Sequence, residues 1–133
     1  MIPQVQDELR QDFALTRLPG RTFRMLHERR RVAGTIDERR ALEQAIFLIL
    51  HTERYAWLIH SWNYGVEFRR LIGQDPAYCV PEIERAVREA LLQDDRITEV
   101  RDFAFEIRKK TVRARFTACT IYGPIETELE VPI

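Results

Sequence analysis

Acidic and aromatic residues follow the most apolar stretch of the chain, and they are the first candidates for chemistry. Glu53 comes shortly after the apolar run at residues 45–50, and both tryptophans of the chain, Trp57 and Trp62, follow it closely. A carboxylic acid in apolar surroundings has a raised pKa and can act as a general acid. Paired with a second carboxylate about 5 Å away, or further for inversion, it could hydrolyse a sugar polymer.

The neighbours of Glu53 argue against that reaction. Glu67 or Asp75 would have to supply the second carboxylate. Arg54 is adjacent, and an ion pair with it would lower the pKa of Glu53 instead of raising it. Two tryptophans beside a core helix are also more often packing residues than sugar platforms. We therefore interpret Glu53 and Arg54 as an ion pair, buried or facing a partner, that fixes where the chain leaves its central helix, and we expect no enzyme.

Other chemistry has weaker support in the sequence. His27, His51 and His60 lack HExxH spacing and clustered Cys or Asp ligands, so we expect no metal ion. No phosphate-binding or dinucleotide-binding glycine motif occurs, so we expect no cofactor. Cys79 and Cys119 stand apart without CxxC spacing, and we expect reduced, inert thiols.

Composition limits the class of partner. The chain has 133 residues, with 21 basic and 21 acidic side chains, so no net field draws it to nucleic acid or membrane. The run Arg29-Arg30-Arg31 is interpreted as a solvated turn because no second basic and aromatic stripe supports nucleic-acid binding. With no signal peptide and no apolar run of membrane length, the protein is expected to be made in the cytoplasm and to stay there.

A buried central helix should position Glu53 and Arg54. Thr35 and Glu38 fit a capping box, with Asp37 as the rival cap, so the helix should begin here. Residues 45–50 are apolar on all sides, which predicts a helix surrounded by other elements. One face of this helix is formed by Leu42, Ala45, Ile46, Ile49 and Leu50.

Two further helices are expected after it. Residues 63–65 indicate a turn, and residues 66–72 a short helix that ends at Gly73. Residues 74–80 are expected to form a loop, and Pro81 to occupy the first position of an amphipathic helix. The apolar face of that helix is Ile83, Ala86, Val87, Ala90 and Leu91.

The remaining segments alternate as strands do. Residues 22–36 predict a β-hairpin, and the end of the chain a three-stranded antiparallel meander with turns at Lys109-Lys110 and Gly123-Pro124. A slip in the alternation predicts a β-bulge near Arg101 and Asp102. The expected fold class is α+β: a buried central helix and an amphipathic second helix on a small antiparallel sheet. Residues 1–20 are expected to form an arm and residues 21–133 a single domain.

A set of residues along the central segment stands in a familiar order. These residues are Ala45, Ile46, Leu50, Thr52, Glu53, Arg54, Tyr64 and Gly65, followed by the expected short helix. In order and spacing they resemble the lysozyme-like baseplate wedge family of contractile phage tails, typified by a small wedge protein of the T-even phages. The branch most resembled occurs in phages and defective prophages of Gram-positive bacteria. The likeness runs from about Thr22 to the C-terminus.

The same resemblance draws attention to residues 94–96. The family has a Glu-Pro-Arg motif here that contacts the core bundle of the baseplate wedge, and this chain has Asp94, Asp95 and Arg96 instead. The arginine is kept, the acid is shorter by one methylene, and the proline is lost. Another interpretation stands open: an Asp-rich turn whose arginine caps the carbonyls of the preceding helix.

The resemblance implies a structural function. It predicts a baseplate wedge subunit, present in several copies in the virion tail, that joins the wedge to the sheath and initiates sheath assembly. The implied partners are other wedge subunits, the tail sheath protein and the tail tube or hub. Wedge contacts are expected at Asp94, Asp95, Arg96, Glu53 and Arg54, and sheath contacts at the arm and at an edge strand. A peptidoglycan-degrading tail lysozyme is the alternative.

Overall fold

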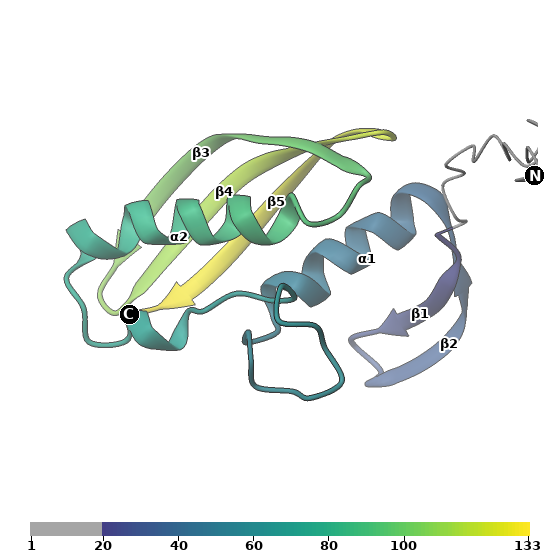
Figure 1. Cartoon of the computed structure of the whole chain (residues 1–133), viewed down its shortest axis with the longest axis horizontal. Helices are drawn as coiled ribbons and strands as arrows, with labels where there is room; N and C mark the ends of the chain where they lie inside the picture. The colour runs from purple at the N-terminus through teal and green to yellow at the C-terminus, as the bar shows by residue number, and fades with distance from the viewer. Residues whose placement is uncertain (1–19) are drawn as a thin grey trace, which may run out of the picture.

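The computed structural model describes residues 20–133 and contains two layers, a three-stranded antiparallel sheet and two helices on one of its faces (Figure 1). The predicted α+β class is confirmed. A separate β-hairpin precedes the helices. The predicted arm, residues 1–20, lies outside the described residues except for Gly20. The elements in order are β1 (Thr22–Leu26), β2 (Arg31–Ile36), α1 (Glu38–Leu50), the 3₁₀ turn η2 (Arg69–Leu71), α2 (Pro76–Leu91), β3 (Ile97–Arg108), β4 (Thr111–Thr120) and β5 (Gly123–Pro132).

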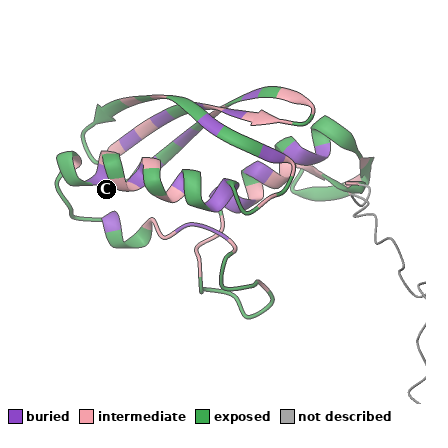
Figure 2. Cartoon of the chain, turned by 45° about the horizontal axis from the view of Figure 1, so that its top comes forward, coloured by how far each residue is buried: buried purple, intermediate pink, exposed green. Residues whose placement is uncertain are grey.

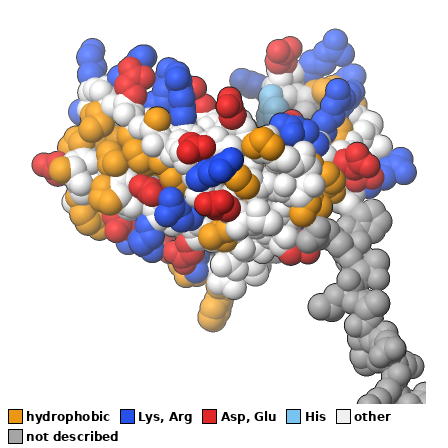
Figure 3. Space-filling view, turned by 90° about the horizontal axis from the view of Figure 1, so that it is seen from above, with side chains coloured by type: hydrophobic (Ala, Val, Ile, Leu, Met, Phe, Trp, Pro, Cys, Tyr) orange, Lys and Arg blue, Asp and Glu red, His pale blue; other side chains and the backbone are white. Residues whose placement is uncertain are grey.

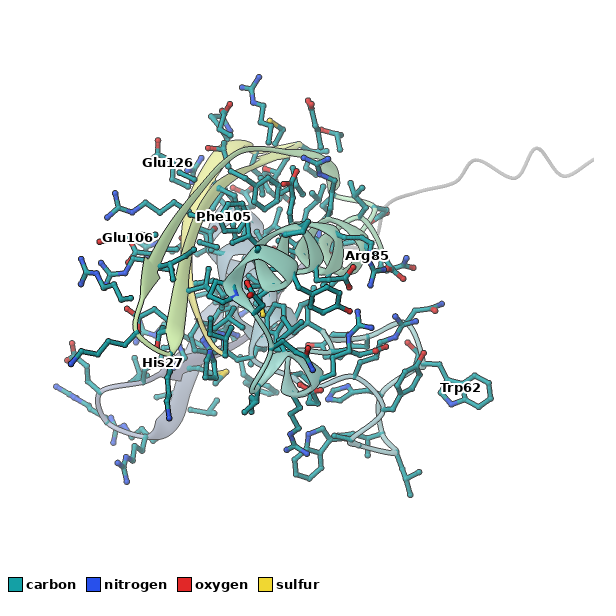
Figure 4. The ribbon with its side chains drawn as sticks, turned by 90° about the vertical axis from the view of Figure 1, so that its left-hand side faces the viewer. His27, Trp62, Arg85, Phe105, Glu106 and Glu126 are labelled. Carbon is teal, nitrogen blue, oxygen red and sulfur yellow. The ribbon has the colours of Figure 1, made fainter. Side chains whose placement is uncertain are left out.

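The sheet has the order β3-β4-β5 and one dry face, because its residues alternate between buried and exposed. The inward residues of β4 and β5 join the apolar faces of α1 and α2 in one core. Phe105 lies on the side of the sheet that faces α2, whereas Glu106 and Glu126 lie on the outer side (Figure 4). The inward residues of β4 and β5 are Val112, Ala114, Phe116, Ala118, Ile125, Leu129 and Val131.

The outer face of the sheet carries cross-strand ion pairs. Arg113 on β4 is 2.7 Å from Glu130 on β5, and Arg115 is 3.1 Å from Glu128. These side chains are exposed or, for Arg113, partly exposed, so each pair contributes about 1 kcal/mol or less. Seen from above, the surface likewise mixes positive and negative side chains (Figure 3).

Helix α1 begins at Asp37, whose carboxylate accepts a 2.7 Å hydrogen bond from the N–H of Glu38. The capping box from Thr35 is wrong because β2 continues through Ile36, so Thr35 pairs with Phe23 in the hairpin. The expectation of burial on all sides is also wrong. Phe47 is partly exposed, because the fold has only two layers and the side of α1 away from the sheet meets little beyond the hairpin.

Helix α2 begins five residues earlier than predicted, at Pro76, so the expected loop at residues 74–80 is wrong. Asp75 has an extended backbone, as a residue before proline prefers, and its side chain accepts a 2.8 Å hydrogen bond from the N–H of Ala77. Pro76 takes the first helical position that was expected for Pro81. Pro81 lies inside the helix, which tolerates it because Cys79 and Ile83 beside it are completely buried in the core.

Polar side chains attach α1 to both sheets. The Gln44 side chain accepts a hydrogen bond from the N–H of Met25 at 2.9 Å and donates one to the carbonyl of Phe23 at 2.8 Å, which ties β1 to α1. The Arg39 guanidinium donates to the carbonyls of Tyr122 and Pro124 at 3.3 and 2.9 Å. The second pair of bonds holds the start of α1 against the turn between β4 and β5.

The bulge predicted in β3 is confirmed. The register of β3 against β4 shifts between Arg101 and Ala104, and Asp102 has φ +58°. Aspartate tolerates this left-handed conformation better than most residues. A bulge of this kind twists the strand locally and leaves the edge of β3 irregular, whereas β5 pairs with β4 without a shift.

Candidate partner-binding site

The segment after α1 crosses back over itself. Glu53 and Val66 form an isolated parallel bridge, with hydrogen bonds from Arg54 N–H to the Val66 carbonyl at 2.9 Å and from Val66 N–H to the Thr52 carbonyl at 3.0 Å. Gly65 makes this approach possible: it has φ +94°, and a Cβ there would lie 2.5 Å from the Thr52 oxygen. The crossing closes residues 54–65 into a loop that projects from the body of the molecule (Figure 2).

The Glu53 carboxylate binds backbone N–H groups and is not free to act on a substrate. It accepts hydrogen bonds from the N–H groups of Phe68 and Arg69, at 3.3 and 3.4 Å, and so fixes the entry to the 3₁₀ turn. The short helix predicted at residues 66–72 is therefore reduced to Arg69–Leu71, because Val66 is used in the bridge. Asp75, another acid considered for sugar hydrolysis, is also occupied, because its side chain caps the start of α2.

Arg54 connects this crossing to α2. Its Nε donates to the carbonyl of Trp62 at 2.6 Å, and its guanidinium lies 3.4 Å from Glu89 and 3.7 Å from Glu67. The predicted ion pair between Glu53 and Arg54 is thus wrong in its partners, because the two side chains point to different groups. The expected role is confirmed: both residues fix the path of the chain after α1.

Residues 94–96 form the second part of the site, at the junction of α2 and β3. The Arg96 guanidinium binds both oxygens of Asp94, at 2.9 and 2.7 Å, and the N–H of Arg96 donates to the same carboxylate at 3.0 Å. The two side chains are only 14% and 17% exposed. Of the open alternative, the Asp-rich turn is present, because Asp94 accepts the N–H of Arg96, but the Arg96 guanidinium donates to Asp94 and does not cap the preceding helix.

Electrostatics keep Asp94 ionised. Burial raises the pKa of its carboxyl, but hydrogen bonds from the side chain and backbone of Arg96 and the nearby positive charge outweigh burial, so the pKa lies below its ordinary value. A carboxyl with a lowered folded-state pKa stabilises the fold fully above its unfolded pKa, about pH 4. That stabilisation is lost as the pH falls through the lower folded-state pKa.

We therefore expect a pH-dependent cost for Asp94→Asn. At pH 7 the variant should lose about 1–3 kcal/mol of unfolding free energy, because Arg96 keeps its charge in a mostly buried position without a counter-ion. The difference from wild type should shrink as the pH drops below about 4. Urea denaturation of both proteins at a series of pH values measures it.

Asp102→Asn is the matched control for that experiment. The Asp102 side chain is 70% exposed and lies 3.6 Å from its arginine neighbour, Arg101. We expect a change of about 0.5 kcal/mol or less at every pH. A loss for Asp94→Asn that is equal at pH 7 and at pH 3 would contradict the ionised pair.

The two parts of the site come from different segments: Glu53 and Arg54 follow α1, and residues 94–96 follow α2, which Arg54 reaches at Glu89. Arg54 and Gln93 line one small cleft, and Gln93 directly precedes Asp94 in sequence. Gly20, the first described residue, lies beside Arg96, since a Cβ on Gly20 would be 2.8 Å from the Arg96 guanidinium. Whether Asp94, Asp95, Arg96, Glu53 and Arg54 bind other subunits stays a prediction.

The structure corrects the interpretation of the tryptophans. Trp57 and Trp62 were expected to pack beside the core helix, but they are 62% and 81% exposed on the projecting loop. The sequence contains one signal for this, because no Asp, Glu, Lys or Arg occurs between Arg54 and Glu67. Periodicity misleads here: the spacing of Tyr55, Leu58, Ile59 and Trp62 fits one face of a helix, whereas the chain forms turns.

Residues 20–133 contain no group of three or more His, Cys, Asp and Glu side chains arranged to hold a metal ion. None of the helices in the same range is long and apolar enough to cross a membrane.

Comparison with known proteins decides the family. Residues 22–123 match the model of the contractile injection system sheath initiator family. The chain belongs to this family. It is also 34% identical, over 113 residues, to the phage-like element PBSX protein XkdS of Bacillus subtilis (strain 168), an alignment that covers 82% of this chain and 80% of the relative.

Membership confirms the resemblance found in the sequence. The matched range takes in every residue of the candidate site, from Glu53 and Arg54 to residues 94–96, together with the hairpin, both helices and the first two strands of the sheet. This sheath initiator is therefore a structural, sheath-related component of a contractile tail system. The PBSX relative places its branch among phage-like elements of a Gram-positive bacterium.

Proposed function

We propose that this sheath initiator is a baseplate wedge subunit, present in several copies per baseplate in the virion tail, that joins the wedge to the sheath and starts sheath assembly without catalysing a reaction. In this proposal residues 21–133 act as one domain and residues 1–20 as an arm. Asp94, Asp95, Arg96, Glu53 and Arg54 contact other wedge subunits. The arm and β5 contact the tail sheath protein, with the tube or hub as a further neighbour.

Within residues 20–133 no strand pairs with the outer edge of β5, and this open edge is the observation that carries the proposal. Ile133 N–H donates to the Lys110 carbonyl at 2.8 Å, and antiparallel partners alternate between bonded and unbonded pairs. Counting back from Ile133, the even-numbered residues of β5 turn their backbone groups away from β4. Pro124 and Pro132 are both even-numbered, as expected of prolines that must not interrupt the ladder. The outward N–H groups belong to Glu126, Glu128 and Glu130.

A strand from another chain can pair with these groups. Edge strands invite such addition, with backbone hydrogen bonds supplying affinity. Beside the edge, a groove between α1 and β5 offers an apolar floor that includes Ile46, Leu50 and Ile125. The other edge of the sheet, β3, is bulged and therefore a poorer template.

The hydrolase alternative has no support in the geometry. Glu53, its best general acid, already accepts two backbone hydrogen bonds, and Asp75 caps α2. Trp57 and Trp62 project from the surface and do not line a cleft with these acids.

Electron microscopy of particles from a producer lacking this gene tests the proposal. We expect bare tubes, unattached sheath or no tails, and normal tails after the wild-type gene is returned. Glu53→Gln is a second arm, because it removes the proposed acid but keeps an oxygen that can accept hydrogen bonds. Normal contractile tails from the deletion strain, or normal assembly with loss of wall clearing in the Glu53→Gln strain, would overturn the proposal.

A further inference from the structure

Exposed large apolar side chains of the described chain are concentrated in the loop at residues 55–62. Leu58 is 105% exposed and Ile59 is 89% exposed, and three aromatic side chains flank them. Trp62 points away from the body of the molecule (Figure 4). Contiguous apolar surface of this kind on a soluble chain marks an interaction site. The aromatic residues are Tyr55, Trp57 and Trp62.

The loop is held at its base and within its tip. Arg54 binds the Trp62 carbonyl at 2.6 Å, and the Glu53–Val66 bridge closes the base. Within the loop, His60 N–H donates to the Trp57 carbonyl at 3.3 Å, and the His60 ring stacks on Tyr64 with centroids 4.3 Å apart. A loop organised before binding loses little conformational entropy when a partner covers it.

The charge pattern selects the class of partner. Residues 55–66 contain no Asp, Glu, Lys or Arg, so the loop offers no charge to anionic lipid or to phosphate. The charged groups at its base are already paired, Arg54 with Glu67 and Glu89. The complementary surface is therefore an uncharged apolar pocket of a protein. Indole N–H groups at the rim would need acceptor oxygens there.

We propose that residues 55–62 form an apolar plug that inserts into an uncharged pocket on another protein subunit of the tail. Leu58 and Ile59 insert into the pocket, and Trp57 and Trp62 pack around its rim, where they exclude water. This plug is a second anchor, separate from the charged residues 94–96 and from the β5 edge. The inference rests on the proposed function only in naming a tail subunit as the partner.

The test uses the double variant Leu58→Ser, Ile59→Ser in the full chain, expressed in the deletion strain. Both side chains are almost fully exposed, so the unfolding midpoint of the purified variant should match wild type. Quantitative mass spectrometry of purified particles should show its incorporation reduced about tenfold or more. The matched control is Ile72→Ser, which removes an apolar side chain, 59% exposed, outside the loop and should incorporate normally.

A photo-reactive phenylalanine analogue at position 58 identifies the occupant in assembled particles. Crosslinking to another tail subunit supports the plug. Crosslinking to a second copy of this chain overturns it, as does flotation of the wild-type chain, but not the double variant, with phosphatidylglycerol vesicles. Normal incorporation of a folded double variant also overturns it. That last result leaves the proposed function intact if the deletion strain still lacks normal tails, so the two ideas fail separately.

Discussion

Gly65→Ala is expected to lower the free energy of unfolding by about 3 kcal/mol or more. Gly65 has φ +94°, which side chains rarely adopt, and a Cβ there would lie 2.5 Å from the Thr52 carbonyl oxygen and 3.2 Å from the Arg54 nitrogen. Both neighbours are backbone atoms in the bridge that closes the loop, so neither can move without breaking a hydrogen bond. Urea denaturation followed by circular dichroism measures the loss.

Gly73→Ala separates the two causes of this loss. Gly73 has φ +84°, but nothing lies within 4 Å of the Cβ position, so only the backbone strain applies. We expect a cost of about 1–2 kcal/mol. Equal losses for the two variants would show that the close approach of residue 65 to Thr52 is not present in the folded protein.

Glu126→Pro is expected to abolish sheath attachment while the domain stays folded. The N–H of residue 126 points away from β4, so proline removes a hydrogen-bond donor from the open edge and none from the sheet. Unfolding free energy should change by about 1 kcal/mol or less. Electron microscopy of particles from a deletion strain carrying this variant should show tubes without attached sheath.

Glu126→Ala is the matched variant, because it removes the same side chain and keeps the N–H. It should support normal tails. Sheath that forms normally on Glu126→Pro baseplates would place the sheath contact somewhere other than the β5 edge. Loss of tails with both variants would assign the effect to the carboxylate and not to strand pairing.

The regular parts of the fold could be predicted because their signals are local and repeated. The alternation in β4 and β5 gives each strand one apolar face to bury, so the meander follows from the sequence. The bulge at Arg101 and Asp102 is visible as a slip in the same alternation. The start of α2 was misplaced because Pro81 fits a first helical turn as well as Pro76 does.

The residues of the candidate site were proposed from the sequence, but their contacts within the fold were not. Adjacent opposite charges suggested a pair between Glu53 and Arg54, yet neighbours along an irregular chain need not face each other. Glu53 reaches the backbone at Phe68 and Arg69, and Arg54 reaches Glu89 on α2, 35 residues away. Asp94 and Arg96 are two residues apart on one tight turn, so that pair is short-range and could be foreseen.

By itself the sequence determined the α+β class, the strands of the meander and the buried face of each helix, because each depends on residue types repeated at short spacing. The family followed from a resemblance in the order of particular residues, which the comparisons confirm. Only the tertiary structure decided that residues 54–65 close into a loop and turn Trp57 and Trp62 outward. That outcome depends on a backbone crossing between Thr52 and Val66, with Gly65 at its closest point. Every residue type except proline offers the same backbone hydrogen-bonding groups, so no pattern of side chains in the sequence predicts where two backbone segments will pair.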